Sequence, residues 1–105
     1  MKLSVIERFL LGQMMGNYQG NFTNLKLVRE GREALSFNEE EIRELKFVQE
    51  GNQMQWNSMA AIKYQAVEVP IGENVTSIIK DMLRKLNDDA QLTDQHFSLY
   101  EKFMI

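Results

Sequence analysis

The sequence predicts an α+β fold with about five helices and a small antiparallel sheet of two or three strands, in the order ααα-ββ-β-αα. Three observations carry this prediction: apolar residues at helical spacing early in the chain, two-residue alternation on both sides of a Gly51-Asn52 turn, and a strongly amphipathic stretch after Gly72. The chain has 105 residues, a common size for one domain, so we expect a single domain over residues 1–105.

Two helices are expected near the start of the chain. Ser4 followed by Glu7 forms a capping-box pattern, and apolar residues then recur at helical spacing over roughly residues 5–15. The second helix, over residues 23–36, contains Gly31. A glycine inside a helix costs about 1 kcal/mol relative to alanine, unless close packing against a neighbour requires it.

A short third helix has a strong start signal. Asn38 can cap it, and the acidic first turn Glu39-Glu40-Glu41 complements the positive end of the helix dipole. Phe37 before the cap and Ile42 inside the helix have the spacing of a hydrophobic staple, so we expect them to pack together.

The clearest β-hairpin of the chain follows this helix. Gly51-Asn52 is a two-residue turn signal between two stretches whose polarity alternates. Pairing about this turn sets Phe47 opposite Trp56 and Gln49 opposite Met54, which gives the hairpin one mostly apolar face. We expect that face to lie on helices.

The second half of the chain is expected to contain one more strand and two more helices. Residues 57–61 are ambiguous between loop and helix, whereas residues 64–71 look extended and predict a third strand. The strongest amphipathic pattern of the sequence then predicts a helix over residues 73–86. Leu92-Thr93 has the staple-and-cap pattern that opens a last helix.

The predicted core consists of the apolar faces of these periodic segments. Its members are Phe9, Leu25, Val28, Leu35, Ile42, Leu45, Val75, Ile79, Met82, Leu86, Phe97 and Tyr100. The chain has seven methionines, which fit either an irregular core or an adaptable binding face, and the core is favoured.

Composition limits the chemistry that this chain can perform. It is 44% apolar and 26% charged with a net charge of −3, as is typical of a globular protein. It has no cysteine, which excludes disulfides, thiolate zinc sites and a cysteine nucleophile. The one histidine, His96, has no nucleophile placed beside it by any motif, so we expect a surface or capping residue. The sequence therefore predicts no catalytic, cofactor or metal site and a protein that is not an enzyme.

The start of the chain does not have the pattern of a secretory signal. Glu7 and Arg8 interrupt its apolar run, and no cleavage site follows. No apolar stretch approaches the roughly 20 residues that a membrane span needs. We therefore expect a cytoplasmic protein that does not enter a membrane.

Aromatic and methionine residues near the hairpin are the candidate partner-binding residues. Interfaces concentrate Trp, Tyr and Met, which indicates Met54, Trp56 and Tyr64, with a core role for Trp56 as the alternative. The expected last helix adds Phe103 to this set. Its apolar face, which includes Phe97, predicts self-association into a homo-oligomer.

A winged-helix module that binds nucleic acid is the alternative function, because a short helix precedes the hairpin. The three glutamates that open this helix and the net negative charge of the chain oppose contact with phosphates. Two basic strips remain as candidates: Lys26, Arg29 and Arg32, and Lys80, Arg84 and Lys85. We expect both to be solvated helix faces, so a protein partner or a second copy of the chain is favoured over nucleic acid.

Four stretches spread over nearly the whole chain form a pattern: FTNLKLVR at 22–29, LSFNEEE at 35–41, WN at 56–57 and HFSLYEKF at 96–103. In this pattern the chain resembles a group of short proteins encoded by bacteriophages and prophages. The resemblance implies a genomic context and brings no activity, cofactor or catalytic residue. A small acidic protein in that context is expected to bind a host or phage macromolecule.

Overall fold

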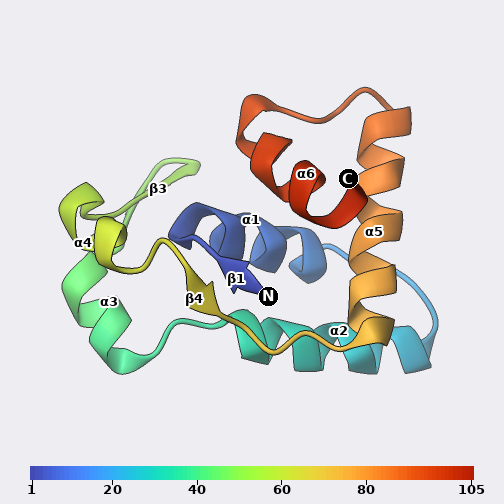
Figure 1. Ribbon diagram of the computed structural model, residues 1–105, viewed down its shortest axis with the longest axis horizontal. Helices are drawn as coiled ribbons and strands as arrows, with labels where there is room; N and C mark the ends of the chain where they lie inside the picture. Colours follow the sequence, from blue (N-terminus) through green and yellow to red (C-terminus); the bar gives the residue numbers. More distant parts are fainter.

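The computed structural model describes residues 1–105 and confirms an α+β fold, with six α-helices and two antiparallel sheets of two strands each (Figure 1). The elements are, in order, β1 (Lys2–Leu3), α1 (Val5–Gly16), α2 (Phe22–Leu35), α3 (Glu39–Leu45), β2 (Val48–Glu50), β3 (Gln53–Gln55), α4 (Ser58–Lys63), β4 (Val67–Glu68), α5 (Glu73–Asp88), the 3-10 helix η1 (Asp94–His96) and α6 (Phe97–Met104).

Helix α1 lies at the centre of the molecule (Figure 1). Helix α2 packs along one side of α1, and α5 crosses one end of this pair and contacts both helices. Helix α6 folds back against α5, so the last element of the chain returns to the middle of the molecule. Helices α3 and α4 and the β2–β3 hairpin form the opposite end, which we call the hairpin end.

Two predicted helix starts, at Ser4 and Asn38, are confirmed by their caps. Ser4 and Glu7 form a reciprocal capping box, in which the Glu7 amide donates to Ser4 Oγ at 3.2 Å and the Ser4 amide donates to Glu7 Oε1 at 2.8 Å. Asn38 and Glu41 form a second box at the start of α3. Each box satisfies two amide groups that a helix end otherwise leaves without a partner.

The predicted hairpin and its register are confirmed. Gln49 lies opposite Met54 in the β2–β3 ladder, and the rings of Phe47 and Trp56 meet just beyond it at 6.0 Å between centroids. Gly51 has a φ of +59°, a conformation that glycine adopts without steric cost at a tight turn.

The third strand is present but does not join the hairpin. Only Val67–Glu68 of the expected stretch 64–71 is a strand, and it pairs with β1 in a separate sheet, with Leu3 opposite Val67. The ambiguous segment after the hairpin is helical because Asn57 Oδ1 caps it, accepting hydrogen bonds from two amides at 2.9 and 3.2 Å.

The hydrophobic core lies between α1, α2, α5 and α6. Its thirteen members are Leu3, Leu10, Leu11, Met15, Val28, Leu35, Val69, Val75, Ile78, Ile79, Leu83, Leu99 and Phe103. Of the residues predicted for the core, five are buried: Val28, Leu35, Leu45, Val75 and Ile79. Four more are partly buried: Phe9, Met82, Leu86 and Tyr100.

Three core predictions are wrong because the helices turn a different face inward. Helix α3 buries Glu41 and Leu45, so Ile42 is 51% exposed and lies outside the core. Helix α6 buries Leu99 and Phe103, which leaves Phe97 exposed. Helix α2 buries Val28, Gly31 and Leu35, which leaves Leu25 at the edge of the inward face and exposed.

Gly31 allows α2 to approach its neighbours closely. A Cβ atom at this position would lie 2.5 Å from Met15 Cε of α1 and 2.9 Å from Val75 Cγ1 of α5. Both distances are shorter than ordinary contact between carbon atoms. The glycine inside this helix therefore favours the close packing of three helices.

Two adjacent charged residues of α1 are buried and have separate partners. Glu7 accepts a hydrogen bond from Lys102 Nζ of α6 at 2.6 Å. Arg8, on the other side, donates to Glu41 of α3 and to the Ser36 carbonyl oxygen. Helix α1 thus connects to the last helix and to the hairpin end through one charged pair each.

Candidate functional site

The hairpin places two of the four predicted partner-binding residues, Met54 and Trp56, in half-buried positions. The Trp56 ring packs on Phe9 of α1, with 5.8 Å between centroids, and on Phe47 of the hairpin. Phe47 in turn contacts Phe37, at 4.9 Å between centroids. These aromatic contacts attach the hairpin to α1, so Trp56 contributes to structure and offers only part of its surface to a partner.

Tyr64, the third predicted residue, is also half-buried and lies just after α4. Its hydroxyl donates a 2.7 Å hydrogen bond to Glu44 Oε2 of α3, and Lys63 Nζ lies 3.2 Å from the same carboxylate. The hydrogen bond to Glu44 raises the pKa of Tyr64, and the bonds from Tyr64 and Lys63 lower the pKa of Glu44. This polar cluster fastens α4 to α3.

Phe103, the fourth predicted residue, is not available to a partner. Its side chain is 5% exposed and belongs to the main core, so the prediction is wrong. Leu99 and Phe103 are four residues apart, which places both on the face of α6 that packs inward. Of the two phenylalanines predicted for an apolar outer face of the last helix, Phe103 is therefore buried and only Phe97 is exposed.

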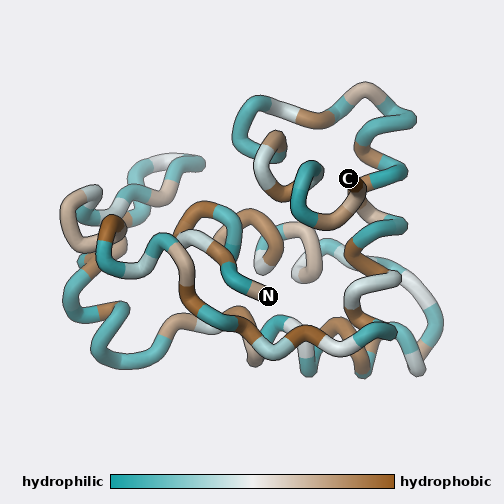
Figure 2. The backbone as a smooth tube through the Cα atoms, in the orientation of Figure 1, coloured by the Kyte–Doolittle hydropathy of each residue, from teal (hydrophilic) through white to brown (hydrophobic).

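Helix α4 carries an unexpected exposed pair of apolar side chains. Met59 is 79% exposed and Ile62 is 63% exposed, and their three-residue spacing places them on one face of the helix. We call this pair the α4 patch. None of the residues of α4 is buried, and the apolar colouring of Figure 2 continues onto this helix at the far edge of the hairpin end.

A signal for the α4 patch exists in the sequence. Asn57 is a good N-cap residue, and Met59 and Ile62 follow at helical spacing. In a segment of only six residues, however, two apolar residues at helical spacing do not distinguish a helix from a loop. Two further apolar side chains at the hairpin end are about half exposed, Ile42 of α3 and Val48 of β2.

His96 has a structural role as a capping residue. Its Nδ1 atom lies 3.0 Å from the Thr93 amide, which donates to it, and 3.0 Å from the Thr93 hydroxyl. Thr93 and His96 together form the capping box of η1, just before α6. No group of three or more His, Cys, Asp or Glu side chains is arranged to hold a metal ion.

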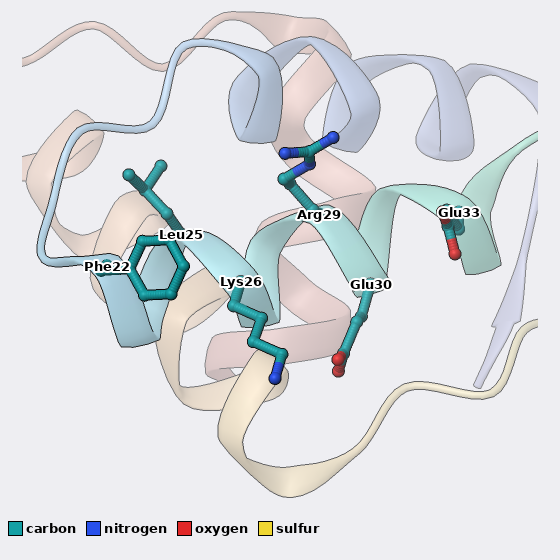
Figure 3. A pocket seen from close by; sticks show the side chains of 6 residues that line it. All are labelled: Phe22, Leu25, Lys26, Arg29, Glu30 and Glu33. Carbon is teal, nitrogen blue, oxygen red and sulfur yellow. The ribbon is translucent and has the colours of Figure 1, made fainter.

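The elements considered for nucleic-acid contact do not form a continuous basic surface. The hairpin has no lysine or arginine over residues 47–56, and the buried carboxylate of Glu41 faces Arg8. On α5, Arg84 is paired with Asp81 at 2.8 Å. Two of the three basic residues of α2, Lys26 and Arg29, border a shallow depression of about 490 Å³ that two glutamates also line (Figure 3).

No protein-family model, curated protein or solved structure shows a significant match to this chain. None of its helices combines the length and the apolar character that crossing a bilayer would require.

Proposed function

We propose that this chain is a non-enzymatic interaction protein that binds a protein partner through the α4 patch. Its resemblance to short phage and prophage proteins supports an accessory role of this kind in the cytoplasm. The observation that carries the proposal is the exposure of Met59 and Ile62 on a helix that buries none of its own residues.

Helix α4 has little to stabilise it besides its ends. An isolated helix of six residues is not stable in water, because nucleating the first turn is unfavourable. The Asn57 cap and the Lys63 and Tyr64 contacts with Glu44 hold its two ends, while Met59 and Ile62 contact water. Covering the patch would therefore stabilise the helix and remove apolar surface from water.

The surroundings of the patch resemble the rim of a protein interface. Lys63, the last residue of α4, lies 3.8 and 3.2 Å from the carboxylate oxygens of Glu40 and Glu44 of α3. Interfaces combine an apolar centre with a polar rim of this kind. We expect the partner to present an apolar groove bordered by polar groups.

Nucleic acid is the less supported alternative. Three glutamates open α3, and the hairpin that would serve as a wing has no basic residue. Affinity for phosphates depends on lysine and arginine side chains that neutralise them. A salt-dependent affinity for duplex DNA would favour this alternative over a protein partner.

A photo-crosslinking residue placed at position 59 tests the proposal in the native host. We expect p-benzoylphenylalanine in place of Met59 to give a discrete crosslinked protein, and the additional substitution Ile62→Asp to abolish the product. The same photo-crosslinker in place of Lys80, which is exposed on α5, serves as the control. Identical products at both positions, or none at position 59, would overturn the proposal.

A further inference from the structure

The outer face of α2 carries an exposed stripe of apolar and charged side chains (Figure 3). Its six members line the depression of about 490 Å³: Phe22, Leu25, Lys26, Arg29, Glu30 and Glu33. All six are exposed, and Phe22 at the start of the helix is 81% exposed. The stripe lies opposite the face that α2 buries against α1 and α5, except for Leu25, which lies at the edge of that face.

The charges of this stripe are separated by sign along the helix. Lys26 and Arg29 come first and Glu30 and Glu33 follow, so the basic half precedes the acidic half. Lys26 and Glu30, and likewise Arg29 and Glu33, have the four-residue spacing of a helical ion pair. None of these four side chains forms a salt bridge or hydrogen bond within the chain.

We propose that the outer face of α2 binds the same face of a second copy of this chain, with the two helices antiparallel. Antiparallel packing about a two-fold axis between Arg29 and Glu30 sets Lys26 against Glu33 of the second copy and Arg29 against Glu30 of the second copy. Each contact occurs twice, because the same surface is used on both copies. The four unpaired charges thereby find partners of opposite sign.

The apolar members of the stripe fit the same arrangement. Phe22 and Leu25 lie at one end of the stripe, so in an antiparallel pair they extend over the end of α2 of the second copy. There they meet the carboxyl-terminal turn of α2, and part of their exposed apolar surface leaves water. The dimer thus combines apolar contacts at its two ends with ion pairs at its centre.

The size of the contact sets the expected strength. Fourteen residues of α2 span about 21 Å at 1.5 Å per residue, so the contact covers one side of one helix. Interfaces below about 1,200 Å² in total are weak and reversible. We therefore expect a dimer that dissociates on dilution and weakens as salt screens its ion pairs.

The proposal is independent of the α4 patch. Helix α4 lies at the hairpin end, whereas α2, which begins at Phe22, packs against α1 and α5 (Figure 1). Changes at Met59 or Ile62 are therefore expected to leave dimerisation unchanged, and changes on α2 to leave partner crosslinking at position 59 unchanged. Failure of one proposal does not imply failure of the other.

Reversing the charge order of α2 tests both the surface and the orientation. The variant Lys26→Glu/Arg29→Glu/Glu30→Lys/Glu33→Lys keeps the net charge and exchanges the basic and acidic halves. We expect wild type and this variant each to dimerise, and the two not to pair with each other, since like charges would then face one another. Sedimentation velocity from 10 µM to 1 mM, with one species fluorescently labelled, measures all three combinations.

Two partial variants measure the contribution of the charges. Lys26→Glu/Arg29→Glu makes all four positions acidic, and we expect its dimer dissociation constant to rise at least tenfold, with an unchanged far-ultraviolet circular dichroism spectrum. The matched control Lys80→Glu/Lys85→Glu changes the same net charge on α5 and is expected to dimerise as wild type does.

Three outcomes would overturn the proposal. A wild-type protein that is monomeric at 1 mM has no such dimer. Equal weakening by the α2 variant and its α5 control would mean that net charge and no particular surface governs association. Preferential pairing of wild type with the reversed variant would indicate parallel helices, contrary to the proposed antiparallel packing.

Discussion

Arg8 and Glu41 form a salt bridge that is almost wholly shielded from water, although 33 residues separate them in the sequence. The Arg8 guanidinium also donates to the carbonyl oxygens of Leu35 at 3.3 Å and Ser36 at 2.7 Å, and it lies 4.1 Å from the centroid of the Phe37 ring. The Arg8 side chain of α1 therefore donates hydrogen bonds to carbonyl oxygens at the end of α2 and to a carboxylate in the first turn of α3. These bonds orient the hairpin end relative to the core.

Replacing Arg8 by methionine is expected to cost about 3–5 kcal/mol of unfolding free energy, because Glu41 would remain buried without a counter-charge. Urea denaturation measures the change. Arg84→Met is the control, since its salt bridge with Asp81 is exposed and is worth less than about 1 kcal/mol.

The double variant Arg8→Met/Glu41→Met keeps this prediction testable if the single variant does not fold. Removing both charges eliminates the uncompensated carboxylate, so we expect the double variant to be more stable than Arg8→Met alone. A double variant that is less stable than the single variant would contradict a buried and mutually compensated pair.

Acid is expected to destabilise the protein through Glu7. Burial raises the pKa of this carboxyl group, but hydrogen bonds from Lys102, the Ser4 amide and Ser98 outweigh it and hold the pKa below the usual value of 4.5. As the pH falls below about 4.5, the unfolded chain takes up a proton before the folded chain does, so the stabilisation present above this pH is progressively lost.

Urea midpoints measured from pH 7 to pH 3 test this dependence. We expect Glu7→Gln to flatten the acid limb relative to wild type, since it removes the group that takes up the proton. Glu50→Gln, at an exposed hairpin position, should leave the acid limb unchanged. Parallel acid limbs for wild type and Glu7→Gln would exclude Glu7 as a source of the acid sensitivity.

Gly31 and Gly12 are expected to respond oppositely to alanine. A Cβ atom at Gly31 would meet Met15 and Val75, and overpacking of this kind costs about 1–3 kcal/mol. A Cβ atom at Gly12, inside α1, meets nothing within 4 Å, so Gly12→Ala should stabilise by about 0.4–1 kcal/mol. Thermal unfolding of the two variants would contradict this packing if both melted above wild type.

Ala90→Gly is expected to stabilise the end of α5. Ala90 has a φ of +54° and follows the last turn of the helix, where its amide and that of Gln91 donate to Asn87 and Leu86 carbonyl oxygens. Glycine is the favoured residue at this position of a Schellman motif, so we expect a gain of about 0.5–1 kcal/mol. Ala66→Gly is the control, because Ala66 does not have a positive φ, and we expect it not to stabilise the protein. A higher melting temperature for both variants would contradict backbone strain at Ala90.

Local patterns predicted the parts of the fold that depend on neighbours in the sequence. The capping boxes of Ser4 and Asn38 and the register about Gly51 each require residues only a few positions apart. The β1–β4 sheet pairs Leu3 with Val67 through strands of two residues each. Such strands are too short to show the alternation of apolar and polar residues by which a strand is predicted.

Long-range charge pairing explains one of the three errors in the predicted core, that at Ile42. Glu41 turns inward because Arg8 is there to meet it, and this turns Ile42 outward. Apolar periodicity alone assigns the inward face to Ile42, because it treats glutamate as a solvent residue. No pattern within either segment reveals a partner 33 residues away.

The candidate site was predicted only in part. Interface composition indicated the hairpin and the residues after it, and it selected Trp56 and Tyr64, which are half-buried and contact Phe9 and Glu44. Residue type predicts what an interface contains and does not show which side chains the fold leaves free. The exposure of Met59 and Ile62 became visible only in the structure.

The cellular activity of Ile62→Asp and of His96→Gln, compared with wild type in the native host, tests the central claim most directly. Glutamine can replace His96 in its capping box, so this variant should keep its melting temperature and its activity. Ile62 is exposed, so aspartate there should leave the melting temperature unchanged and abolish partner binding. Lost activity in His96→Gln and full activity in Ile62→Asp, both at wild-type stability, would contradict an interaction protein that works through α4.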